Sequence, residues 1–156
     1  MAQSIAALFR RPDVGIRVVL IYGVRRAEDV LLRDQLFNWV ERRRDVFRLV
    51  ICVGSRYNNV HMGAASLAKG RARDYIPPPD LLEALCGATA AVVQGWINED
   101  VIKEHAFPPS VDDTRVLVCG LPGVYLKICG PRSCDDVSPG SALANLGYTK
   151  QQVIKL

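Results

Sequence analysis

The chain of 156 residues is poor in the groups that build metal centres and disulfide frameworks. It has two histidines, His61 and His105, and five cysteines without a Cys-x-x-Cys pair, so no set of metal ligands forms at a sensible spacing. The cysteine number is odd, and Cys52 and Cys119 fall in apolar segments, which favours reduced thiols in a cytosol-facing protein. The sequence therefore predicts neither a bound metal nor a disulfide scaffold.

Long apolar runs and concentrated charge are missing too. No run approaches the length of a bilayer span, and the first residues lack the apolar core of a secretory signal. The net charge is +4, but its densest basic run, Arg42–Arg44, lies between Glu41 and Asp45, as in a solvated helix end. We expect a cytoplasmic protein without a nucleic-acid partner, or one at the cytosol-facing membrane surface if the full protein carries an anchor.

What is present is an alternation of apolar strands and amphipathic helices. The strands show almost no polar alternation, as in parallel sheets, and are joined by helices, which implies right-handed crossovers. Strands are expected near 17–24, 47–53, 115–119 and 152–154, with 89–93 as a strand or a packed return segment. Helices are expected over 3–11, 27–43, 99–105, from about 123, and over 141–146. This predicts a single α/β domain over residues 1–156: a Rossmann-like, doubly wound, mainly parallel sheet with helices on both faces.

One region does not fit the alternation. Residues from about 57 to 92 include a Gly-, Ala- and Arg-rich stretch and the run Pro77–Pro79, which is typical of a long surface insertion. Within it, residues 81–85 are predicted to form a short helix.

The segment with the clearest functional potential follows the strand at 115–119. It reads Cys119-Gly120-Leu121-Pro122-Gly123, in which glycine lets another molecule approach the main chain and proline stiffens the turn. Ligands sit at the carboxyl ends of strands in parallel sheets. A buried strand followed by an ordinary turn explains this segment alone equally well.

Several segments in a fixed order resemble the nicotinamide-nucleotide domain of the cytochrome b5 reductase family, within the ferredoxin–NADP reductase-like flavoproteins. The resemblance rests on Cys-Gly-x-Pro-Gly at 119–123, Gly130, Leu-x-x-Leu-Gly-Tyr at 143–148, Gln-Val-x-Lys at 152–155, the acidic-aliphatic segment 28–36 and Gly-Trp-Ile-Asn-Glu at 95–99. These pieces cover most of the chain outside residues 57–92.

The resemblance implies a function. Such enzymes take a hydride from NADH or NADPH onto FAD and pass single electrons to a haem protein such as cytochrome b5. By resemblance, Cys119, Gly120, Leu121 and Pro122 line the nicotinamide end and position the ring, with no side chain acting as a catalytic acid or base. The family's FAD is held mainly by a preceding β-barrel domain, so a flavin-binding domain of the same or another chain is the implied partner.

The sequence also departs from the family. The flavin-binding barrel is absent, and the family's glycine-rich pyrophosphate loop would lie just before Gln3. We therefore expect the chain to be an N-terminally truncated piece. The alternative is a non-catalytic binding or interaction module that kept the fold but lost turnover. An unrelated flavodoxin-like binder is disfavoured by the C-terminal motif.

Nucleotide choice depends on the end of the strand at 47–53. NADH-preferring members place an aspartate there, whereas this chain has Gly54 followed by Ser55 and Arg56. The Ser55 hydroxyl and the Arg56 guanidinium resemble the groups with which NADP-preferring members bind a 2′-phosphate. The equally weighted alternative is that both residues belong to an ordinary polar loop. Tyr22, near the end of the first strand, is a further candidate cofactor contact, although β propensity alone explains an aromatic residue there.

Overall fold

The structure is a computed structural model that describes residues 2–10, 15–54 and 90–156. These residues fall into two compact units, one within Gly15–Ile97 and one within Met1–Val14 and Asn98–Leu156. We call them the three-stranded unit and the two-stranded unit, after their sheets. In the described part of the chain, no helix is both long enough and apolar enough to cross a membrane.

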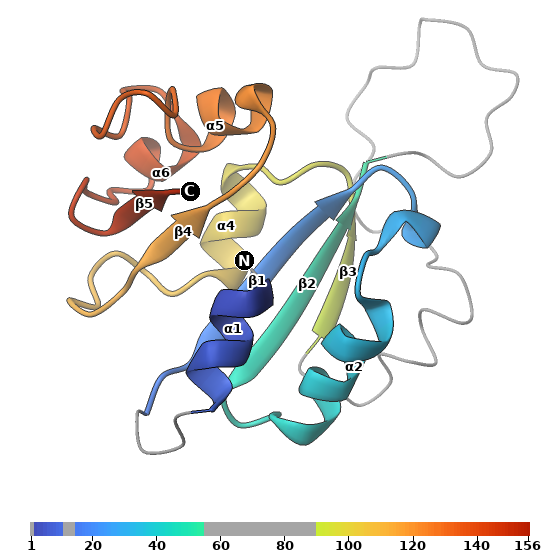
Figure 1. Cartoon of the computed structure of the whole chain (residues 1–156). Helices are drawn as coiled ribbons and strands as arrows, with labels where there is room; N and C mark the ends of the chain where they lie inside the picture. The colour runs from blue at the N-terminus through green and yellow to red at the C-terminus, as the bar shows by residue number, and fades with distance from the viewer. Residues whose placement is uncertain (1, 11–14, 55–89) are drawn as a thin grey trace, which may run out of the picture. The chain divides into compact units, whose positions relative to one another are not determined.

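The three-stranded unit is built on β1 (Val18–Val24), β2 (Phe47–Val53) and β3 (Ala90–Gln94), which are parallel and lie in the order β1-β2-β3 (Figure 1). The three predicted strands are confirmed, including the one left open at 89–93. The last residues of the predicted insertion at about 57–92 thus lie in β3, which begins at Ala90. The predicted helix at 81–85 lies outside the described residues.

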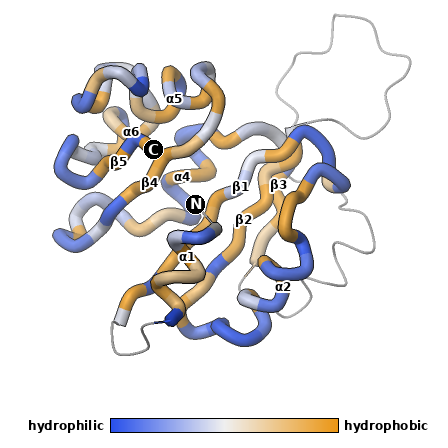
Figure 2. Tube along the Cα trace, viewed as in Figure 1, coloured by the Kyte–Doolittle hydropathy of each residue, from blue (hydrophilic) through white to orange (hydrophobic). Residues whose placement is uncertain are grey.

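The core of this unit is β2. Its residues Leu49–Val53 are all buried, as expected for a strand with a parallel neighbour on each side. Helix α2 (Arg33–Arg42) packs on this sheet with Leu36, Phe37 and Val40 buried, each contributing about 1.5–3 kcal/mol by leaving water. Figure 2 shows the same division, with hydrophobic residues along the strands and hydrophilic stretches along α2.

The single helix predicted over 27–43 is wrong in one respect, because the segment is broken. A short 3-10 helix, η1 (Ala27–Asp29), precedes α2, and Leu32 between them has a left-handed backbone with φ 55°. The N–H of Leu31 donates to the hydroxyl of Tyr22 at 3.3 Å, so the interruption is held by a side chain from β1. Helical periodicity cannot reveal such a contact.

The two-stranded unit contains the parallel pair β4 (Val116–Val118) and β5 (Val153–Lys155). Its helices are α1 (Ala2–Phe9), α4 (Glu99–His105), α5 (Pro122–Ile128) and α6 (Ala142–Asn145). The α/β class with parallel strands is thus confirmed. The described strands form two hydrogen-bonded sheets where one was predicted, because strand patterns reveal strands without their partners.

The Leu-Gly-Tyr motif at 146–148 ends α6. Gly147 has φ +86° and donates to the carbonyl of Ala144 at 3.0 Å, while Tyr148 N–H donates to Leu143 at 2.9 Å. These bonds form a Schellman cap, which needs glycine at the left-handed position. The Tyr148 hydroxyl donates to the Phe107 carbonyl at 2.6 Å. This part of the family resemblance is therefore explained by helix termination.

Candidate functional site

The carboxyl ends of the three parallel strands meet at one edge of the three-stranded sheet. Gly54 N–H donates to the Val24 carbonyl at 2.8 Å, and Gly95 N–H donates to the Val53 carbonyl at 2.8 Å, so the ladder continues just past each strand. Arg25, Gly54 and Gly95 are thus the first residues beyond the sheet. This edge is where parallel α/β sheets bind ligands.

After β3 the chain turns at Gly95, with φ +111°, and crosses the ends of the neighbouring strands. A β-carbon on Gly54 would lie 2.3 Å from Cε2 of Trp96, so the indole rests directly on the glycine backbone. A β-carbon on Gly23 would lie 3.3 Å from Cδ1 of Ile97. Trp96 nevertheless remains 56% exposed, so the indole packs on the strand end with one part and faces solvent with the rest.

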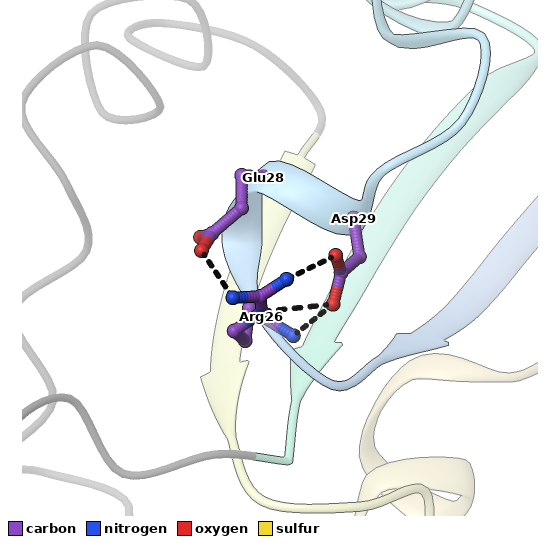
Figure 3. A network of polar contacts seen from close by, with 3 residues as sticks. All are labelled: Arg26, Glu28 and Asp29. Carbon is purple, nitrogen blue, oxygen red and sulfur yellow. Dashed lines mark hydrogen bonds and ion pairs between the residues drawn. The ribbon is translucent and has the colours of Figure 1, made fainter.

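A charged network follows β1, as Figure 3 shows. The Arg26 guanidinium pairs with Glu28 at 3.4 Å and with Asp29 at 3.2 Å, and the Arg26 backbone N–H donates to Asp29 at 3.1 Å. The hydrogen bonds from Arg26 lower the pKa of the Asp29 carboxyl below its usual value. The network therefore fixes the turn after β1 and keeps Asp29 ionised, with its charge compensated.

Of the remaining cofactor residues predicted near this edge, Tyr22 is half-buried and supports the 3-10 turn through Leu31. Tyr22 alternates with Gly23 along β1, so it lies on the face opposite the Gly95–Ile97 crossing. Ser55 and Arg56 lie outside the described residues.

In the two-stranded unit, the Cys119–Pro122 turn follows β4 directly. All four residues are exposed, and Leu121 reaches 77%. Cys119, predicted inside the strand, lies one residue beyond it, because β4 ends at Val118. Helix α5 begins at Pro122, where the missing N–H costs nothing. The turn therefore offers main chain and apolar surface to an approaching molecule.

Two side chains whose roles were not predicted from the sequence hold the strand ends and a later loop of this unit in place. The Tyr125 hydroxyl lies within hydrogen-bonding reach of the carbonyls of Val118 and Leu156, at the ends of β4 and β5. Lys155 Nζ donates to three carbonyls of the following loop, Pro131 at 2.9 Å, Cys134 at 2.6 Å and Asp136 at 2.9 Å. Lysine at 155 belonged to the resemblance motif, but no sequence signal identified these acceptors.

The cysteines differ in accessibility. Cys52 and Cys129 are buried, whereas Cys119 and Cys134 are exposed. Burial raises the pKa of the Cys52 thiol to about 11 and also raises that of Cys129. At neutral pH both buried groups are therefore protonated packing residues. Across the described ranges, no three His, Cys, Asp or Glu side chains gather as a potential metal site.

The fold and these edges define an α/β domain with parallel sheets and open turns at its strand ends. No family model matches the chain. It is 28% identical to NADH-cytochrome b5 reductase 2 of Aspergillus fumigatus over 99% of the chain and 39% of the relative. The protein of that name from Neurospora crassa is 28% identical over 99% of the chain and 37% of its own length. The one from Debaryomyces hansenii is 25% identical over 98% of the chain and 42% of its own length.

The chain is similar to these cytochrome b5 reductases over almost its whole length, which confirms the resemblance inferred from its motifs. It spans about two-fifths of the length of these curated relatives.

Proposed function

We propose that this chain is the nicotinamide-nucleotide-binding part of a flavin-dependent NAD(P)H oxidoreductase resembling cytochrome b5 reductase. The observation that carries the proposal is the exposed Cys119–Pro122 turn at the carboxyl end of β4, in a chain related to named reductases over 99% of its length. No observation favours the alternative of a non-catalytic module.

The turn is suited to a planar, uncharged ring. Gly120 leaves the main chain open, and neither Cys119, Leu121 nor Pro122 carries a charge. Its role is to position the dihydronicotinamide, which when bound supplies a hydride for transfer to a flavin. Catalysis by this chain is therefore positional. Tyr125 holds the strand end that precedes the turn, and Lys155 holds the loop at residues 131–136.

The edge of the three-stranded sheet, taken by itself, carries groups suited to an adenosine phosphate. The exposed indole of Trp96 provides an aromatic face for a base, and Arg25 adds an exposed positive charge for a phosphate. Tyr22 contributes indirectly by holding the turn after β1. Ser55 and Arg56 remain proposed contacts on the sequence argument alone.

The remaining parts of the reaction are assigned to other components. We propose that FAD is held mainly by a flavin-binding domain, of the same or another chain, because the relatives are more than twice as long as the matched segment. A haem protein such as cytochrome b5 is the proposed electron acceptor, on the strength of the relatives' names.

The proposal is tested by following backbone amide resonances of the whole chain during titration with NADH and, separately, with ADP-ribose, which lacks nicotinamide. We expect NADH to shift the amides of Gly120 and Leu121, and both ligands to shift the indole N–H of Trp96. The buried amides of Leu143 and Val40 serve as internal controls. Unmoved Gly120 and Leu121 resonances at saturating NADH would refute the proposed nicotinamide contact.

A further inference from the structure

We propose that the packing of Trp96 on Gly54 removes the discrimination against a 2′-phosphate, so that the site accepts NADPH at least as well as NADH. This inference rests on the proposed nucleotide function and concerns the edge of the three-stranded sheet alone. It departs from the names of the relatives, which specify NADH.

The first step is steric. Parallel α/β proteins that select NAD commonly use a carboxylate at a strand end, which accepts a hydrogen bond from the ribose 2′-hydroxyl and repels a 2′-phosphate. At the end of β2 that carboxylate has no room, because a β-carbon on Gly54 would lie 2.3 Å, 2.5 Å and 2.7 Å from three carbons of the Trp96 ring. The indole occupies the space that an aspartate side chain would need.

The second step is electrostatic. The acids after β1, Glu28 and Asp29, are paired with Arg26. Arg25 directly follows Val24, whose carbonyl accepts the Gly54 N–H, so it lies beside Gly54 across the ladder. Among the described residues that follow β1, Arg25 and Arg26 balance Glu28 and Asp29, so residues 25–29 carry no net negative charge. A 2′-phosphate beside this turn therefore meets no uncompensated carboxylate among the described residues 25–29, and Arg25 supplies a cation for it.

The inference is tested by calorimetric titration of the whole chain with 5′-AMP and with adenosine 2′,5′-bisphosphate. We expect the bisphosphate to bind at least as tightly as 5′-AMP. Arg25→Ala is expected to weaken the bisphosphate about fivefold to tenfold and to change 5′-AMP less than twofold. The matched control is Arg42→Ala, in the last turn of α2 before β2 begins, which should change neither ligand.

A carboxylate can also be installed where the indole now lies. Trp96→Ala alone should weaken both ligands by the same factor, because it removes a base contact without adding charge. Trp96→Ala combined with Gly54→Asp should then shift the preference at least tenfold toward 5′-AMP. Thermal unfolding of both variants verifies that each is folded before its affinities are compared.

The outcomes separate the inference from the proposed function. If both nucleotides bind and 5′-AMP is preferred by tenfold or more, the inference is overturned and the nucleotide site stands. If neither nucleotide binds, the adenosine site is refuted and the inference with it. An unchanged preference in the double variant would overturn the assignment of selectivity to the Trp96–Gly54 packing.

Discussion

The two strand ends that carry proposed cofactor contacts, one in each unit, are built by different means. At the edge of the three-stranded sheet, the surface is formed by an aromatic side chain and by charged side chains. Trp96 packs on Gly54, and Arg26 forms ion pairs with Glu28 and Asp29. At the end of β4, the exposed turn is uncharged, and its surroundings are held by backbone geometry and carbonyl acceptors. The first arrangement suits recognition of charge and an aromatic base, and the second suits close approach of a flat ring.

The largest effect on stability is expected at Gly130, whose backbone geometry helps to hold the two-stranded unit. This residue has φ +90°, and a β-carbon on it would lie 2.0 Å from Ser138 Oγ. Gly130→Ala is expected to lower the free energy of unfolding by about 2–4 kcal/mol, measured by urea denaturation.

The control for Gly130 is Gly123→Ala, within α5. A β-carbon there meets nothing within 4 Å, and alanine favours helix, so we expect an increase of about 0.5–1 kcal/mol. Equal effects of the two substitutions would contradict the role assigned to the left-handed backbone at 130.

A substitution at Gly54 disrupts the packing of the Trp96 side chain at the edge of the three-stranded sheet. Gly54→Ala should cost about 1–3 kcal/mol, because the Trp96 ring must move off the strand end. The Trp96 fluorescence should shift to longer wavelength as the indole gains solvent. In a double-mutant cycle with Trp96→Ala the cost of Gly54→Ala should largely vanish, and strict additivity would show that the two residues do not interact.

A smaller effect, on binding, is expected at Gly120. A β-carbon there would lie 3.1 Å from Val124, so Gly120→Val crowds the turn proposed to receive the nicotinamide. We expect NADH affinity to fall about tenfold and ADP-ribose affinity to stay within twofold. A parallel loss for both ligands in calorimetry would show that the substitution acts on the chain's fold instead.

The smallest effect concerns the charged network. The pKa of Asp29 is lowered from 3.8, so its contribution to stability is present above that pH and is lost as pH falls through the lower, folded-state value. Asp29→Asn should flatten this part of the pH dependence of the unfolding midpoint. Asp113→Asn, which removes one carboxylate from the exposed loop before β4, is the matched control for the loss of a negative charge.

The comparison also shows what the sequence could predict. Continuous apolar runs identified the strands within one or two residues, because a buried parallel strand needs apolar residues on both faces. The Cys119–Pro122 turn was found because glycine and proline constrain the local backbone directly. Both signals are local in the chain.

Contacts between distant segments could not be predicted in this way. The break before α2 depends on Tyr22 meeting Leu31, and the crowding at Gly54 depends on Trp96, 42 positions later. The arrangement of strands into two sheets depends on pairing partners that strand patterns do not specify. The sequence shows that Gly54 stands where NADH-preferring members have an aspartate, but only the structure shows that the Trp96 indole occupies that space.

The most direct test of the account is calorimetric titration of the whole chain with NADH and with NADPH. We predict saturable one-to-one binding of both, with dissociation constants below about 1 mM, and no preference for NADH. Absence of saturable binding of either nucleotide would contradict the central claim that this chain binds a nicotinamide nucleotide.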